Sequence, residues 1–137
     1  MKGPEEDVDT FKKRLVGHSP WPQCQQPGDK PNLLNFHNLV PIPVEVLAAG
    51  DAAGHEWERE HWGCRYGASE TRIIDEWKGW VIYEFETAWA PPTAFLETVA
   101  KQWPTLVMIL EYEELGMGFK GIAKFEGENH EDHCLQL

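Results

Sequence analysis

The feature that most constrains the fold of this chain is the change of pattern in its C-terminal two-thirds. Four stretches there have the β-branched and aromatic composition, or the alternation, of strands: residues 71–76, 80–87, 106–113 and 119–126. The segment that separates the second stretch from the third instead has an apolar helical face, made of Phe95, Leu96, Val99 and Trp103. The pattern therefore predicts two pairs of strands with one amphipathic helix between them.

Short connections support this order. Trp77-Lys78-Gly79 is a glycine-containing link that predicts a hairpin between the first two strands, and Gly116-Met117-Gly118 predicts a turn between the last two. The amphipathic helix is expected to open at Pro91-Pro92 and to end at Pro104, because proline suits a first helical turn and cannot continue a helix.

The N-terminal residues predict a further helix over 3–15. Its first turn is acidic and its last turn is basic, which complements the helix dipole, and Val8, Phe11 and Leu15 share one face. Residues 18–62 are rich in proline, glycine and polar residues and predict a long irregular insert, with short helical turns at 44–49 and 55–62. The polar, acidic residues 127–137 are expected to form a flexible tail.

Strands that form antiparallel pairs, with helices to one side, indicate an α+β fold in which the helices cover one face of the sheet. The length of 137 residues suits one domain, which we expect to span residues 1–126.

The charge of the chain limits its partners. It has 12 basic and 23 acidic residues and a formal net charge of -11, without a cluster of lysine and arginine. Direct nucleic-acid binding is disfavoured, because that binding depends on clustered cations. Strong negative charge attracts proteins with a basic surface. An equal alternative is that the acidic residues serve only to keep the protein soluble.

The three cysteines, Cys24, Cys64 and Cys134, are few and odd in number. No apolar run approaches the length of a membrane span or of a signal-peptide core. The expected setting is therefore the reducing cytoplasm of the host cell, with no membrane partner.

Several segments in the same order resemble one known family, the Api92-like (YubB-type) ferredoxin-like proteins of phages and plasmids. The resemblance covers about residues 3–126 and is carried by Gly3–Val8, Asn35–Pro43, Trp62–Ala68, Phe85–Pro92 and Gly116–Gly121. It implies a ferredoxin-like antiparallel sheet and an origin in a mobile genetic element. It implies no catalytic residues and no cofactor.

The chain departs from the family pattern in two places. An apolar strand usually precedes the Gly3-Pro4 turn, whereas only Met1 and Lys2 precede it here. Either this first strand is lost or the start of the chain is truncated, and a missing strand leaves a sheet edge free to pair with another chain. The second departure is Cys64, which stands where a small polar residue is expected, and this weakens its interpretation as an inherited functional thiol.

Alternation along the predicted strands separates two faces of the sheet. Val81, Tyr83 and Phe85 are expected to face the helices, and an outer face carries apolar residues at one end and carboxylates at the other. The partner-binding residues predicted from this face and its neighbouring turns are Glu84, Glu86, Glu111, Glu113, Trp80, Trp89, Tyr66 and Arg65. A competing explanation is that the insert folds over the outer face and buries it.

Imidazole and thiol groups also gather in two segments. His55, His61 and Cys64 are weak zinc candidates, and a second group comprises His130, His133 and Cys134. Neither group has the spacing of a known zinc motif, so solvated histidines beside an incidental cysteine are the favoured interpretation and no metal is predicted. A Cys64–His61 nucleophile lacks a third, orienting group, and catalysis is disfavoured.

Three functional hypotheses follow. The first is a small, non-catalytic interaction module that binds a basic host or mobile-element protein, in its most specific form a nucleic-acid-binding host defence factor. The second is an enzyme or nucleotide-binding protein that uses the turns Trp62–Ala68 and Thr87–Pro92, where Tyr66 and Trp89 stack a ligand and Arg65 contacts an anion. The third is a homodimer that forms through the exposed sheet edge.

Overall fold

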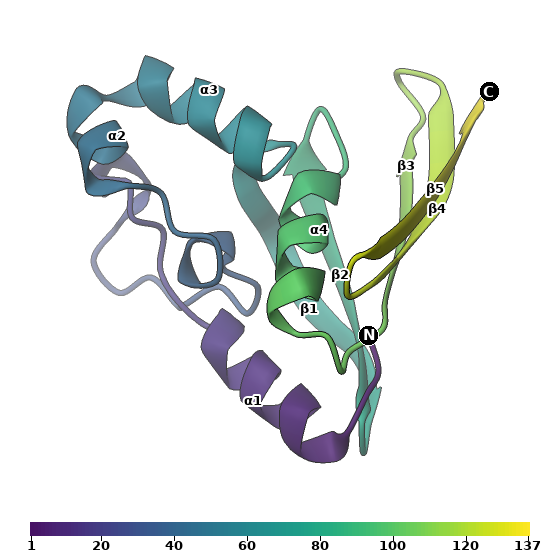
Figure 1. Ribbon diagram of the computed structural model, residues 1–137. Helices are drawn as coiled ribbons and strands as arrows, with labels where there is room; N and C mark the ends of the chain where they lie inside the picture. Colours follow the sequence, from purple (N-terminus) through teal and green to yellow (C-terminus); the bar gives the residue numbers. More distant parts are fainter.

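The first helix, α1 (Glu5–Leu15), confirms the N-terminal prediction. The computed structural model describes all residues 1–137, and Figure 1 shows α1 at one end of a layer of helices. Val8, Phe11 and Leu15 are buried on the face that the spacing predicted. Three acidic residues lie in the first turn and three basic residues in the last, where each group meets the opposite end of the helix dipole.

The insert at 18–62 is more helical than expected. It contains two short 3₁₀ turns, η1 (Pro22–Cys24) and η2 (Phe36–Asn38), and two helices, α2 (Val44–Ala49) and α3 (Asp51–His61). Helix α3 begins four residues before the expected start. Within it, Gly54 allows the Trp21 ring to pack directly on the helix, because a Cβ at this position would lie 2.2 Å from Trp21 Cζ2.

The two strands of the first hairpin are β1 (Arg65–Trp77) and β2 (Trp80–Ala88). They pair antiparallel and the turn is Lys78-Gly79, with Gly79 at a φ of +79°, a left-handed conformation that favours glycine. The register shifts three times, and each shift places extra residues on β1, so β2 remains the regular strand of the pair.

Helix α4 (Thr93–Gln102) follows Pro91-Pro92 as predicted and connects the two sheets. It buries Phe95, Val99 and Ala100. The ring of Phe36 stacks on Phe95 with a centroid distance of 3.9 Å, so the insert packs beside α4 on the helical side of the molecule. The competing explanation, that the insert covers the outer face of the sheet, is therefore wrong.

The C-terminal strands are β3 (Met108–Glu114), β4 (Phe119–Glu126) and β5 (Asn129–Gln136). They form an antiparallel sheet in the order β3-β4-β5. The expectation of a flexible tail over 127–137 is wrong, since β5 pairs with β4 along its whole length. Every residue of β5 is exposed, so backbone pairing with the edge of β4, and not burial, defines this strand.

The five strands form two sheets and not one. β1 and β2 form the first, β3, β4 and β5 form the second, and the chain start connects them. Lys2 makes an antiparallel bridge to Trp80 of β2 and another to Val107, the residue before β3. Figure 1 shows the N-terminus where the sheets are closest, and β2 and β3 diverge from that point.

The first three residues therefore form a short central strand. Lys2 N donates to Val107 O at 2.9 Å and Val107 N donates to Lys2 O at 2.8 Å, while Val81 N donates to Met1 O at 3.0 Å on the other side. The resulting strand order, β1-β2-Met1–Gly3-β3, places these residues in the position of the expected first strand. Residues Met1–Gly3 thus take part in the central strand between the two sheets.

The predicted alternation of faces is confirmed. Val81, Met108, Leu110, Ala123 and Phe125 are buried against the helices. The outer face carries exposed apolar residues, with Ile82 at 43%, Ile109 at 56% and Ile122 at 46% exposure. It is open to solvent.

None of the helices is both long and apolar enough to cross a lipid bilayer.

Candidate functional site

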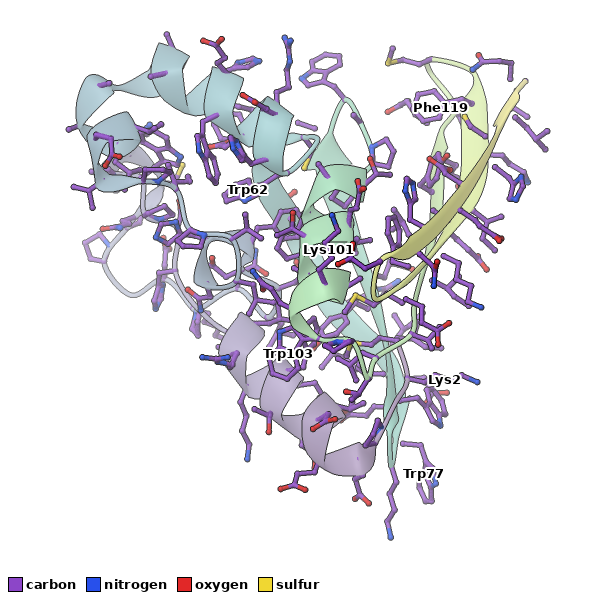
Figure 2. The ribbon with its side chains drawn as sticks, in the orientation of Figure 1. Lys2, Trp62, Trp77, Lys101, Trp103 and Phe119 are labelled. Carbon is purple, nitrogen blue, oxygen red and sulfur yellow. The ribbon has the colours of Figure 1, made fainter.

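A cleft of about 960 Å³ lies between β2 and β3, where the two sheets separate. Its floor is made of apolar side chains from the helical layer, among them Phe11, Phe36, Phe95 and Leu96. Met1 lies at its closed end, where the chain start joins the sheets. In Figure 2, Lys2 and Phe119 lie at opposite ends of the C-terminal sheet, and Phe119 is also a lining residue of the cleft.

All four glutamates that the sequence predicted as partner-binding line this cleft. Glu84 and Glu86 lie on β2, and Glu111 and Glu113 lie on β3. All four side chains are exposed, and Glu114 adds a fifth carboxylate. No lysine, arginine or histidine lines the cleft, so all of its charged side chains are carboxylates.

One of these carboxylates already has a partner. Arg72 on β1 donates from Nε to Glu84 Oε1 at 2.8 Å, in a pair of which both side chains are largely exposed. Such a surface pair contributes at most about 1 kcal/mol, so it can exchange for another cation. No ion pair engages Glu86, Glu111 or Glu113.

Trp89 lies at the end of β2 and also lines the cleft. It is 78% exposed and has a φ of +71°, an unusual conformation for a bulky residue. Residues that hold such a conformation cluster at binding and active sites. An exposed indole beside an acidic rim can anchor a partner, as the sequence predicted.

The other predicted aromatic residues lie elsewhere. Trp80 is half-buried where Lys2 bridges the sheets, so its position is structural. Tyr66 is 58% exposed but lines a different cavity of about 630 Å³, between the insert and the start of β1. Tyr66 and Trp89 line different cavities, so the structure has no site in which both side chains stack on one ligand.

The prediction that Arg65 contacts a partner or an anion is contradicted by its burial. Its side chain is 4% exposed and its guanidinium pairs with Asp51 and Glu58. The Tyr66 ring stacks on it with 4.3 Å between Cζ and the ring centroid. Arg65 therefore stabilises the junction of α3 and β1.

Glu58 is the centre of this junction, and the sequence analysis missed it. It is fully buried and accepts hydrogen bonds from Trp21 Nε1 at 3.0 Å, Tyr66 N at 2.7 Å and Arg65 Nη1 at 3.5 Å. A glutamate on a charged helix resembles a surface residue, and its partner Trp21 is 37 positions away. Only the fold brings these groups together.

The predicted metal candidates do not converge. Cys64 is 1% exposed, while the His61 ring stacks on Trp57 at 4.3 Å and its Nδ1 hydrogen-bonds to the Trp57 carbonyl. His55 is exposed on α3. No group of three or more histidine, cysteine, aspartate or glutamate side chains in this structure is arranged to hold a metal ion.

The second group does not converge either. His130, His133 and Cys134 lie along β5, where adjacent residues point to opposite sides. His130 stacks on Phe125, with ring centroids 5.2 Å apart, whereas His133 pairs in register with Ile122.

The thiol of Cys64 is unsuited to nucleophilic chemistry. Burial raises the pKa of this thiol to about 12, which a backbone hydrogen bond at Gly67 only partly offsets and the nearby Glu58 carboxylate reinforces. The thiolate is the reactive form, so a group with this pKa is unreactive near neutral pH. Cys64 packs in the core.

The fold is that of an α+β protein whose antiparallel strands form two sheets, and the groove between β2 and β3 has an apolar floor and an acidic rim. A family model described as the ferredoxin-like domain in Api92-like protein matches residues 61–136. The chain therefore belongs to this family, as its resemblance indicated. No curated protein and no solved structure matches it.

Proposed function

We propose that this chain is a non-catalytic protein-interaction module of a mobile genetic element, and that it binds a basic host or element protein through the cleft between β2 and β3. The observation that carries the proposal is the composition of the cleft: an apolar floor, an exposed tryptophan and five carboxylates without a basic side chain. Apolar anchors inside a charged rim are the usual energetic pattern of protein interfaces.

The charge of the chain supports a basic partner. With a net charge of -11, the protein attracts cationic surfaces over distances comparable to the Debye length, about 8 Å at physiological salt. The most specific form of the proposal is that the acidic cleft occupies the basic groove of a nucleic-acid-binding host defence protein. The setting is the host cytoplasm, which agrees with three free cysteines, two of them exposed.

The test is charge reversal with a matched control. The cleft variant carries lysine at Glu84, Glu86, Glu111 and Glu113. The control carries lysine at four exposed glutamates outside the cleft: Glu45, Glu56, Glu60 and Glu128. Both variants have the same net charge, so they separate the cleft from the overall field of the protein.

In affinity capture from host lysate, quantified by mass spectrometry, the control should retain the basic proteins that the wild type captures. The cleft variant should lose them by at least about tenfold, because close charge pairs are worth about 1.5 kcal/mol or more. Circular dichroism verifies that both variants are folded. Equal capture by the cleft variant and the wild type, or equal loss in both variants, contradicts a cleft-specific interaction.

A further inference from the structure

The second cavity, between the insert and the start of β1, has the size of a small-molecule site. Its volume is about 630 Å³, and ligand pockets span about 300–1,000 Å³. Figure 1 shows the loops of the insert at the left of the view, far from β3, β4 and β5 at the right. The cavity and the cleft share only Leu34 and Phe36 among their lining residues. The cavity can therefore bind a ligand of its own.

Asn35 gives this cavity a buried amide that has no partner in the protein. The residue lines the cavity and is only 6% exposed. Its backbone N–H donates to Leu15 O at 2.7 Å and its carbonyl accepts from Asn38 N at 3.2 Å, but its side chain makes no hydrogen bond to the protein. A buried amide without a hydrogen bond is costly and rare. The Asn35 side chain is thus a polar group without a structural role, at the wall of a cavity.

Tyr66 gives the same cavity an aromatic ring in a fixed position. Its φ of +67° is unusual for a bulky residue, and residues held in such a conformation cluster at ligand-binding sites. The buried Glu58 carboxylate holds the backbone by accepting from Tyr66 N at 2.7 Å, and the Arg65 guanidinium stacks on the ring. The ring is nevertheless 58% exposed, so its other face is free to stack on a ligand.

The charges around this cavity favour an uncharged ligand. Apart from two histidines, its ionisable side chains of clear charge are Asp29 and Lys30, which have opposite signs. Burial lowers the pKa of His37, whose Nδ1 accepts from Ile42 N at 2.9 Å, so the neutral ring carries its hydrogen on Nε2 and can donate it. No arginine lines the cavity, and the net charge of -11 repels phosphates.

We propose that this cavity binds an uncharged adenine nucleoside, whose base stacks on Tyr66 and pairs with the Asn35 amide. Every base has a π-face that an aromatic side chain can stack on. An asparagine amide offers one donor and one acceptor, which match the ring nitrogen N7 and the amino group of adenine. The site retains Tyr66 from the ligand-binding hypothesis and replaces Trp89 and Arg65 with Asn35. It adds a small-ligand function to the proposed protein interaction.

The test is a titration of the full chain with three compounds, followed by the NMR shifts of the protein. The first compound is adenosine. The second is its deaza analogue, in which N7 is replaced by a C–H group, so the base can still stack but loses one acceptor. The third is adenosine monophosphate, which adds a charged phosphate. Adenosine should shift the side-chain amide signals of Asn35 and the backbone amide of Gly67, which follows Tyr66 and lines the cavity.

The three affinities are expected to differ in a set order. The deaza analogue should bind at least about fivefold more weakly than adenosine, because one hydrogen bond is lost. Adenosine monophosphate should also bind more weakly than adenosine, because the protein is strongly acidic. Three results would each overturn the inference: no shift with adenosine at millimolar concentration, equal affinity for adenosine and its deaza analogue, or tighter binding of the monophosphate.

Three variants assign the binding to the named side chains. Asn35→Leu should weaken adenosine at least about fivefold and remove its advantage over the deaza analogue, while the urea unfolding midpoint should not fall, because no internal hydrogen bond is lost. Tyr66→Ala should weaken both compounds at least about fivefold through the lost stack. The control Trp77→Ala removes an aromatic side chain that is 70% exposed and lines neither cavity, and it should bind as the wild type does.

The variants can also overturn the inference. Unchanged adenosine affinity in Tyr66→Ala would show that the base does not stack there. A clear fall of the unfolding midpoint in Asn35→Leu would show that the amide already has a partner inside the protein.

Discussion

Replacing Glu58 by alanine is expected to destabilise the fold by about 3–5 kcal/mol, the usual cost of removing one partner of a buried ion pair. Arg65 would keep its buried guanidinium with only the exposed Asp51 carboxylate as a charged partner. Trp21 Nε1 and Tyr66 N would lose the acceptor that each now uses. Urea unfolding at neutral pH measures this loss directly.

Two variants of the same helix α3 make this test specific. Glu58→Gln keeps an acceptor oxygen but removes the charge, so its loss should be smaller than that of the alanine variant. Glu60→Ala removes an exposed carboxylate and should change stability by less than about 0.5 kcal/mol. Similar stability of Glu58→Ala and Glu60→Ala would show that the buried network contributes nothing.

Substitution of Lys2 by proline is expected to cost about 2 kcal/mol or more, although the Lys2 side chain is exposed. Proline has no N–H to donate to Val107 O, and its ring fixes a φ unsuited to a central strand. This three-residue strand is the backbone connection between the two sheets. Its disruption should therefore lower the unfolding midpoint and loosen β3 relative to β2.

Lys2→Ala is the matched control. It removes the exposed side chain and keeps both backbone hydrogen bonds to Val107, so its stability should lie within about 0.5 kcal/mol of the wild type. If the alanine and proline variants unfold at the same denaturant concentration, the chain start does not hold the sheets together.

The parts of the fold that were predicted correctly are those with a clear period or clear boundaries. β4 has the bounds expected from its alternation, Phe119 to Glu126. α2 also has the expected bounds, because Pro43 precedes it and Gly50 follows it. The period of two also predicted which side chains of β2 and β3 face solvent, and hence the four glutamates of the cleft.

The parts that were missed depend on tertiary contacts. β5 has eight exposed and mostly polar residues, so it carries no hydrophobic alternation, and it is ordered by pairing with β4. Met1–Gly3 is too short to have a period, and its role as a central strand depends on β2 and Val107 lying on either side of it. The irregular composition of the insert likewise gave no indication that the Trp21 ring packs against Gly54.

The candidate site was only partly predicted, because part of it also depends on tertiary contacts. Alternation identified the carboxylates, but the split of the sheet into two, which turns an outer face into a cleft, has no local signal. From the sequence, Arg65 was expected to contact a partner or an anion. Its burial depends on a glutamate from another element.

Amide hydrogen exchange along β2 and β3 tests most directly whether the two sheets are separate along the cleft. Separate sheets predict slow exchange where amides pair with β1 or β4, at Ile82, Glu84, Leu110 and Tyr112. They predict fast exchange where amides point into the cleft, at Tyr83, Phe85, Ile109 and Glu111. Uniform protection along both strands would show that these edges are already paired, and would contradict the account.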